Sequence, residues 1–588
     1  MLKQQIKTNI FYYLALAISF GLILVQLFLL QIINGSKYNE ISEKNYIRIR
    51  RINPNRGMIL DEKLRPLAYN RPSINLYFTP YLINDRQSFL TFISEQLDIT
   101  KERVEKMIYD NRFRTFEEIL IHEDLQVDQL AHIAEMMNYY PELSLKAEIQ
   151  RHYSFPNHYI GYIAKISENE FKQYRNSDYT LNSKIGKIGI EKYYEGLLCG
   201  QSGYEILQVD ASGRNLNLFK NDLNKKPVHG FNVVLTINLE LQEFIHTIFP
   251  RDKAGAVVVL NTRTGGILSY NSFPEYDQNW FTEGLSQMQW DYLNDHEQKP
   301  LIDRVVNGAY SPGSTYKIIS ASFGLEKNYI SEHTLLTSCR GGLQIGNRYF
   351  KCWDEKGHGR SAVNKGIMHS CDVYFYDLSA KFALDEFSEF SYNNYLHTKT
   401  GIDLPTERFG FSPNTDWYKS RLGSHFSTTG LKANLVIGQG EILVTPLSMA
   451  SYYCALANDG LWQTPHLFKE AFNENEVVNY TFFEKTNKKL PVSENTLNIL
   501  QKALFDTVNA PGGTAWRAKV SGVDVYAKTG STENPQGELT HASMAGFARW
   551  NDQAEIAFYI IVENAGGGGA IAGPIANQII NFYQSNIR

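Results

Sequence analysis

The sequence predicts an α+β protein with one apolar helix at its N-terminus and a large mixed domain at its C-terminus. Two observations predict this class. Residues 10–33 form an apolar run, and β-type runs occur near residues 255–273 and again near residues 523–566, with helical patterns between them. Strands at both ends of one region indicate a single sheet, assembled from distant parts of the chain and flanked by helices.

The length and composition fit a globular protein of more than one domain. The chain has 588 residues, of which 43% are hydrophobic and 20% are charged, and this balance is ample for a large core. The net charge of -4 gives neither a basic surface nor an acidic tail. The composition therefore argues against nucleic acid as a partner.

The apolar run predicts a transmembrane helix over residues 10–33, preceded by a cytoplasmic tail of residues 1–9. As a helix the run reaches about 36 Å, enough to cross a bilayer. Lys3 and Lys7 precede it, which favours an N-terminus inside the cell and export of the remainder. A cleaved signal peptide is the alternative, but the Ala-x-Ala pattern lies too early, in the middle of the run.

Two modules are expected after the anchor. In residues 34–235, short β-type runs alternate with charged helical stretches, and no nucleophile, base and acid group together. We interpret this part as a spacer or docking module. Residues 236–588 form the second module, which opens with two strands joined by a turn and closes with an amphipathic helix over residues 574–584.

Ser314 and Lys317, in "SPGSTYKIIS", are the first candidate catalytic pair. Residues i and i+3 share one face of a helix, so the amine can reach the hydroxyl. A lysine deprotonated by burial and by neighbouring cations can accept the serine proton. Pro312 and Gly313 suit a helix start, whose free amides help to bind an oxyanion. Alone the pattern is weak, because a solvated helix face shows it too.

Lys528, Thr529 and Gly530 form a second motif at the end of a predicted strand, "VYAKTGS". The edge of this strand could pair with an extended peptide. Lys528 and Thr529 offer a charge and a hydroxyl to a carboxylate, and Gly530 lets the backbone approach a ligand.

Ser370 and Asp372, in "HSCDVYF", lie between these two motifs. Ser-x-x-Lys, then Ser-x-Asn or Ser-x-Asp, then Lys-Thr-Gly is the signature of penicillin-binding proteins and serine β-lactamases. The chain resembles a class B penicillin-binding protein, most closely the penicillin-binding protein 2 group of the cell-elongation machinery. The segments that carry the resemblance run nearly end to end: "RGMILDEKLRPLAYNRPSINLY" (56–77), "GIEKYYEGLLCGQSGYEILQVDASGR" (189–214), "GQGEILVTPLSMA" (438–450) and "HASMAGFA" (541–548).

The resemblance implies a single transmembrane helix, an elongated α/β pedestal and a C-terminal transpeptidase domain with an antiparallel sheet flanked by helices. It also implies that Ser314 is the acylated nucleophile and Lys317 its general base. Ser370 relays a proton toward the leaving amine with the help of Lys317 or Lys528. Asp372, where the wider family has asparagine, orients substrate or lysine.

The same resemblance assigns the substrate contacts. Lys528, Thr529 and Gly530 bind the terminal carboxylate of the donor, and the backbone amides of Ser314 and Ser531 form the oxyanion hole. The implied reaction is transpeptidation of peptidoglycan stem peptides, in which the donor loses its terminal D-alanine to an acyl-enzyme. An amine from a neighbouring stem then resolves that intermediate, and β-lactam antibiotics acylate the same serine.

Two other functions stay open on the motifs. A D,D-carboxypeptidase or β-lactamase shares them and deacylates with water, but neither needs an anchor and a pedestal. A non-catalytic scaffold of the wall-synthesis complex keeps the pedestal but has no reason to keep all three motifs. The resemblance also implies location in the bacterial cytoplasmic membrane, with the catalytic domain in the periplasm or extracytoplasmic space. A polytopic membrane glycosyltransferase is the implied partner of the pedestal.

Cys339, Cys352, His358 and Cys371 lie close together in the sequence. Three thiolates and an imidazole make a complete tetrahedral set for a structural zinc ion, and the resemblance implies a zinc site at this stretch. A disulfide between two of the cysteines, or inert buried thiols, are the alternatives. Exported proteins tend to pair their cysteines, but the odd total of five cannot pair fully within one chain.

Overall fold

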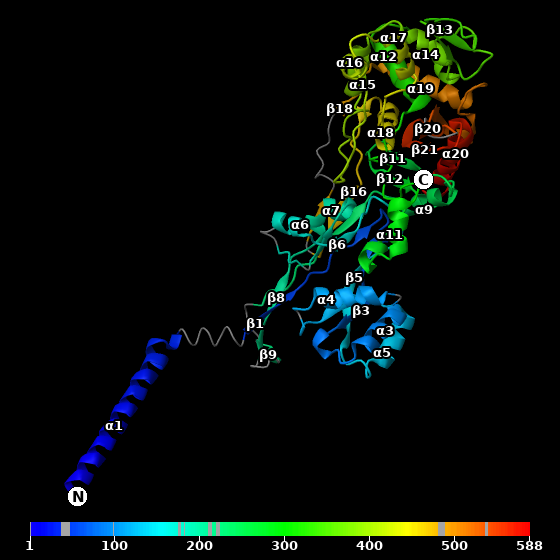
Figure 1. Cartoon of the computed structure of the whole chain (residues 1–588). Coiled ribbons are helices and arrows are strands. Elements are labelled where there is room, and N and C mark those ends of the chain that lie inside the picture. The colour runs from blue at the N-terminus through cyan, green and yellow to red at the C-terminus, as the bar shows by residue number, and fades with distance from the viewer. Residues whose placement is uncertain are drawn as a thin grey trace. The chain divides into compact units, whose positions relative to one another are not determined.

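The computed structural model describes most of the chain as two compact units (Figure 1). One unit comprises residues 1–56 and 199–230, and the other comprises residues 57–198 and 231–588. The described residues are 2–36, 47–97, 99–113, 115–174, 178–181, 183–209, 215–218, 224–474, 476–479, 488–534 and 539–588.

The first unit contains the predicted N-terminal helix. Helix α1 (Leu2–Phe28) continues into a π-helical turn (Leu29–Ile33). Ile10–Ile33 is an apolar span of 24 residues with none of it buried inside the protein, so the predicted helix is confirmed and is long enough to cross a membrane. The unit also has a three-stranded sheet in the order β1-β8-β9: β1 (Ile47–Ile52), β8 (Gly203–Val209) and β9 (Asn215–Leu218).

A seven-stranded sheet organises the N-terminal part of the second unit. Its strands run β17-β16-β10-β2-β3-β4, and β5 pairs with β3. The strands are β2 (Ile59–Leu60), β3 (Pro66–Phe78), β4 (Ile119–His122), β5 (Leu143–Tyr153), β10 (Asn232–Leu235), β16 (Phe468–Phe472) and β17 (Val477–Asn479). Because β10 pairs with β16, this sheet joins both sides of residue 235, and the domain boundary expected there stays a prediction.

Short elements surround this sheet. A separate apolar cluster buries Phe78, Phe89 and Ile93 between β3 and the neighbouring helices. The elements are α3 (Arg86–Leu97), α4 (Lys101–Asp110), α5 (Val127–Met136), β6 (Ile163–Lys165), α6 (Glu168–Gln173), β7 (Lys184–Gly186), α7 (Gly189–Tyr193) and α8 (Glu195–Leu198).

A five-stranded antiparallel sheet forms the centre of the C-terminal part, in the order β12-β11-β21-β20-β19. This order confirms the expectation of one sheet assembled from both ends of the module. The strands are β11 (Gly255–Asn261), β12 (Ile267–Phe273), β19 (Asp524–Thr532), β20 (His541–Trp550) and β21 (Gln553–Val562).

Both faces of this sheet are buried, because side chains alternate between the two faces of a strand and both sets here are apolar. Val257 and Val259 lie in the core cluster that includes helices α9 (Leu239–Ile248) and α20 (Gly568–Asn586). Val258 lies in the other cluster, with α18 (Pro446–Ala457). Figure 1 shows α18 and α20 on opposite sides of β20 and β21.

The segment between β12 and β19 is mainly helical, as the sequence predicts. It also contains the hairpin of β13 (Gly342–Ile345) and β14 (Arg348–Lys351), and the pair β15 (Leu461–Trp462) and β18 (Lys488–Lys489). The helices are α10 (Asn279–Glu283), α11 (Gln287–Asp295), α12 (Lys317–Glu326), α13 (Val363–Met368), α14 (Asp372–Ser379), α15 (Leu384–Asn393), α16 (Thr415–Leu422), α17 (Thr428–Leu435) and α19 (Glu494–Asn509).

A buried ion pair ties β5 to α7. Arg151 Nε lies 2.7 Å from Glu191 Oε1, and the two side chains are 1% and 0% exposed. The guanidinium also donates to the carbonyl of Gly57, 2.8 Å away. The positive charge of Arg151 and the negative charge of Glu191 therefore compensate each other, and neither could remain buried alone without a large energetic cost.

Arg151→Ala should lower the free energy of unfolding by about 3–5 kcal/mol, because it leaves the Glu191 carboxylate buried without its counter-charge. Urea denaturation followed by tryptophan fluorescence measures the change. Lys146→Ala is the matched control: Lys146 lies on the same strand and pairs with Glu118 at the surface, so its loss should cost about 1 kcal/mol or less. Equal costs for the two variants would contradict the buried-pair account.

Candidate active site

The turn that carries Ser314 packs directly on the end of β19. Gly313–Tyr316 form a 3₁₀ helix, and α12 begins at Lys317. With three residues per turn, Ser314 and Lys317 lie on the same face, so the predicted spacing works through a 3₁₀ turn rather than an α-helix. Gly313 has φ +58°, and a Cβ there would lie 3.0 Å from Ser531 O, which leaves no space for a larger residue.

Two lysine amines converge on the hydroxyl of Ser370. Lys317 Nζ donates to Ser370 Oγ over 3.2 Å and to the Ser370 carbonyl over 2.8 Å. Lys528 Nζ donates to the same Oγ over 2.8 Å. Both lysines are 0% exposed. No hydrogen bond joins Ser314 Oγ to Lys317 among those of the described residues, so the contact through which Lys317 could act on Ser314 is not formed in this state.

The surroundings of Lys528 favour its neutral form. Burial lowers the pKa of Lys528 well below its usual value, and the nearby charge of Lys317 lowers it further, while Asp372 has the opposite effect. Two ammonium groups this close repel each other more strongly at a buried site than they would in water. The pKa of Lys528 is therefore lowered both by burial and by the neighbouring charge.

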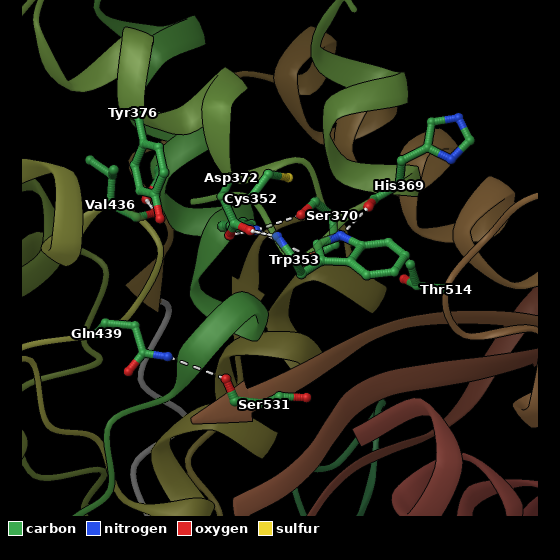
Figure 2. Close-up of polar contacts among 12 residues, drawn as sticks. Cys352, Trp353, His369, Ser370, Asp372, Tyr376, Val436, Gln439, Thr514 and Ser531 are labelled. Atoms are coloured by element: carbon green, nitrogen blue, oxygen red, sulfur yellow. Dashed lines mark hydrogen bonds and ion pairs between the residues drawn. The ribbon is translucent and has the colours of Figure 1, made fainter. Parts of the chain in front are cut away.

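Asp372 uses both carboxylate oxygens on protein groups. Oδ1 lies 2.7 Å from Lys317 Nζ, and Oδ2 accepts the backbone N–H of Trp353 over 3.0 Å. The indole of Trp353 in turn donates to the carbonyl of His369 over 3.0 Å. Figure 2 shows Asp372, Trp353 and Ser370 grouped together at this point. Asp372 thus connects Lys317 to the loop that follows β14.

Ser370 has a left-handed backbone with φ +54°. This conformation is strained for any residue other than glycine, and it occurs often at functional sites. Ser370 lies between α13 and α14. The turn places Ser370 and Asp372 at the lysines and Cys371 in a separate cluster with Cys352. The side chains of "SCD" therefore belong to two different groups.

The third motif lies at the edge of the five-stranded sheet. Gly530 is also tightly packed, because a Cβ there would lie 2.9 Å from Pro312 O and 2.3 Å from Ser543 Oγ. The glycine is needed for packing against the turn of Ser314. Thr529 Oγ1 donates to Thr514 Oγ1 over 3.3 Å, so a second hydroxyl lies beside the one expected to bind a carboxylate.

The backbone of Ser531 faces the open side of β19. Gln439 Nε2 donates to its carbonyl over 3.2 Å (Figure 2). In an antiparallel strand the N–H and the C=O of one residue point to the same side. The N–H of Ser531 therefore points to the open edge as well, where the oxyanion hole was expected.

Gln439, Thr514 and Trp353 were missed as site residues by the reasoning from sequence. Gln439 belongs to a segment that carried the family resemblance, but a pattern in sequence gives no distance to Ser531. Thr514 and Trp353 lie outside the three motifs, and only the tertiary contacts described above bring them to the site.

The four predicted metal ligands form one cluster. Cys339, Cys352, His358 and Cys371 offer ligand atoms that all lie within 4.8 Å of one another. The Sγ atoms of Cys339 and Cys352 lie 3.7 and 3.6 Å from His358 Nδ1. A tetrahedral zinc with Zn–S near 2.3 Å and Zn–N near 2.0–2.1 Å has ligand edges of roughly 3.5–3.8 Å. The residues present therefore fit this metal.

The cysteines of this cluster are free thiols in the structure. The thiols of Cys352 and Cys371 form a hydrogen bond, which lowers the pKa of Cys352 and raises the pKa of Cys371. His369 stacks on His358 with ring centroids 5.6 Å apart but is not a member of the cluster.

Comparison with known families matches nearly the whole chain. Residues 255–581 match the family described as the penicillin binding protein transpeptidase domain. Residues 51–235 match the penicillin-binding protein dimerisation domain.

Individual relatives agree with these matches. The chain is 30% identical to the peptidoglycan D,D-transpeptidase MrdA of Escherichia coli K12, over 97% of this chain and 92% of that protein. It is 28% identical to the MrdA of Acinetobacter baumannii, over 99% of this chain and 88% of that protein. A solved complex of penicillin-binding protein PBP2 with MreC from Helicobacter pylori matches with a TM-score of 0.78 and 25% identity, over 92% of this chain and all of that one.

Proposed function

The chain belongs to the penicillin-binding proteins, in the penicillin-binding protein 2 group, and from this membership we propose how its residues carry out the reaction. It is a serine-type peptidoglycan D,D-transpeptidase, which cross-links stem peptides through an acyl-enzyme. The relatives favour cross-linking over the hydrolase and scaffold alternatives. The observation that carries the assignment of roles is the convergence of Lys317 and Lys528 on Ser370, beside the turn of Ser314.

Acylation begins with the deprotonation of Lys317, which is the general base for Ser314. The neutral amine of Lys528 takes the proton of the Ser370 hydroxyl, and Ser370 takes one from Lys317, over contacts of 2.8 and 3.2 Å. Lys317 is then neutral and removes the proton of Ser314 Oγ as this oxygen attacks the donor carbonyl. The amides of Ser314 and Ser531 stabilise the oxyanion.

Collapse of the tetrahedral intermediate breaks the peptide bond. The proton held on Lys528 passes through Ser370 to the leaving D-alanine amine, and the acyl group remains on Ser314. The acceptor amine then attacks the ester and loses its proton to the same lysine and serine relay. The bond to Ser314 Oγ breaks, and this oxygen recovers a proton from Lys317, which returns the free enzyme. Lys528 and Thr529 hold the terminal carboxylate of the donor before it leaves, and Thr514 supports the Thr529 hydroxyl.

The Cys₃His cluster is proposed to hold a structural zinc ion. Support comes from its fit to a tetrahedron and from the burial of Cys339, Cys352 and Cys371. A zinc ion held by these four residues would fix the loop after β14, which presents the N–H of Trp353 to Asp372. Zinc therefore acts here as a support for the site and takes no part in the chemical steps.

The anchor and partners are proposed from the helix and the relatives. The apolar helix over Ile10–Ile33 holds the protein in the bacterial cytoplasmic membrane as a single pass, with the catalytic domain in the periplasm. The Helicobacter pylori relative was solved with MreC, which supports an MreC-like partner. A polytopic glycosyltransferase that makes glycan strands during elongation is the second partner, and it supplies the substrate strands.

Ser314→Ala should abolish acylation by a fluorescent penicillin without unfolding the protein, because no neighbour replaces the nucleophile. Gel fluorescence and intact-mass analysis measure the adduct. Ser311→Ala is the matched control, since this nearby hydroxyl donates to the Gly440 carbonyl, and it should keep labelling. A penicillin adduct in Ser314→Ala, located by peptide mapping, would overturn the assignment.

Asp372→Asn should slow acylation by about 1.5–3 kcal/mol in activation free energy, the loss expected for a charged hydrogen bond. An amide has one oxygen and cannot accept from both Lys317 and Trp353. Because Asp372 raises the pKa of Lys528, the substitution should also move the acid limb of the pH–rate profile to lower pH.

Asp377→Asn is the control for this test, since Asp377 lies on the same helix and accepts the N–H of Thr337 over 2.8 Å. It should leave the rate of penicillin acylation and its pH profile in place. An unchanged rate and profile in Asp372→Asn would exclude a role for the charge of that carboxylate.

Purified protein should contain one zinc ion per chain by elemental analysis. Cys352→Ser and His358→Ala should lose the metal, melt at lower temperature and acylate more slowly, although neither residue contacts substrate. Cys454→Ser is the matched control, a buried cysteine outside the cluster, and it should keep the zinc. Protein without zinc, with a Cys339–Cys352 or Cys352–Cys371 disulfide in its peptide map, would refute the proposal.

A further inference from the structure

The open edge of β19 determines how an extended donor peptide can bind. A strand added there pairs with Ser531, whose N–H and C=O both face outward. The peptide residue opposite Ser531 places its carbonyl on the Ser531 N–H and its own N–H on the Ser531 carbonyl. The carbonyl of the preceding peptide residue then points away from β19, into the cleft, because successive groups alternate in direction.

In the free protein the Ser531 carbonyl is already occupied. Gln439 Nε2 donates to it over 3.2 Å. The carboxamide thus stands where the N–H of the incoming peptide has to go (Figure 2). Gln439 is partly exposed, so its side chain can turn away without opening the core.

The backbone of Gln439 is built into the turn of the nucleophile. The carbonyl of Gly438 accepts the N–H of Gly313 over 2.9 Å, and the N–H of Gln439 donates to Asn434 O over 3.0 Å. Gly438 has φ +74°, and a Cβ there would lie 2.2 Å from Gly313 O. The backbone of Gln439 is therefore held in place beside the turn of Ser314, while its partly exposed side chain is able to rotate.

Asp372, the acidic residue of the second motif, cannot donate a hydrogen bond to the peptide carbonyl that points into the cleft. A carboxylate is an acceptor only, and both oxygens of Asp372 are already engaged with Lys317 and with the N–H of Trp353. The peptide needs a side-chain donor from another part of the cleft wall.

We propose that Gln439 is a substrate-positioning residue that supplies this donor. The peptide N–H replaces Gln439 Nε2 at the Ser531 carbonyl, and the freed carboxamide donates to the outward carbonyl of the peptide. The exchange conserves hydrogen bonds, because the carboxamide leaves one acceptor and gains another. Gln439 and β19 then hold the peptide from its two edges, and Gln439 selects donors with an amide before the scissile residue. This inference rests on the transpeptidase function.

Two β-lactams distinguish a contact between Gln439 and the donor amide from effects of a substitution on acylation in general. Benzylpenicillin carries an acylamino group, with an N–H and a carbonyl like those of the donor peptide. A carbapenem carries a hydroxyethyl group in its place. The quantity measured is the ratio of the two second-order acylation rate constants, benzylpenicillin over carbapenem, for the full-length protein in detergent. Acylation of the unmodified protein by both β-lactams tests the penicillin-binding function itself, whatever the result for the Gln439 variants.

Gln439→Ala should lower this ratio about tenfold, the effect of one lost hydrogen bond. Gln439→Glu should lower it as much, because a carboxylate keeps the shape but cannot donate. Ser311→Ala is the control for the loop alone: its hydroxyl holds the Gly440 carbonyl, so any change in rate should affect both probes equally and leave the ratio in place.

Two results would overturn the proposal. A ratio within twofold of the unmodified protein in both Gln439 variants would mean that the carboxamide does not contact the donor amide. A higher ratio in Gln439→Ala would mean that Gln439 only blocks the strand edge. Thermal melting of each variant shows that the fold is retained.

Discussion

The structure of the active site depends on the burial of two lysine amines around one serine hydroxyl. Lys317 and Lys528 are both fully buried and both donate to Ser370 Oγ. Two ammonium ions cannot share such a place without a large electrostatic cost. One carboxylate, Asp372, compensates Lys317 over 2.7 Å, while burial and the charge of Lys317 both lower the pKa of Lys528. The lowered pKa of Lys528 is a direct result of this shortage of negative charge.

The rest of the fold holds these groups in place. The five-stranded sheet brings β19 from one end of the module against the turn of Ser314, and Gly313 and Gly530 remove the side chains that would keep them apart. Asp372 extends the site in the other direction, through the N–H of Trp353, to the loop that carries Cys352. A change in the cluster can therefore affect the lysines without any contact with substrate.

Much of this could be predicted from the sequence, because local patterns carry it. The apolar helix, the sheet from both ends of the module and the three motifs each have a signal within a few residues. Gln439, Thr514 and Trp353 could not be found in this way, since their roles come from contacts across about 15 to 90 positions of sequence. A second reason for glycine at position 530 also needs the fold, because only the fold shows that Pro312 lies against it.

The pKa of Lys528 tests this arrangement of two buried amines around Ser370 most directly, because burial and Lys317 both lower it. The most direct measurement is a pH titration by NMR of protein with isotope-labelled lysines, with the Lys528 signal assigned from its loss in Lys528→Arg. The account predicts that Lys528 titrates well below the usual lysine value, because burial and Lys317 both lower its pKa. A Lys528 that titrates at or above the usual value would contradict the account.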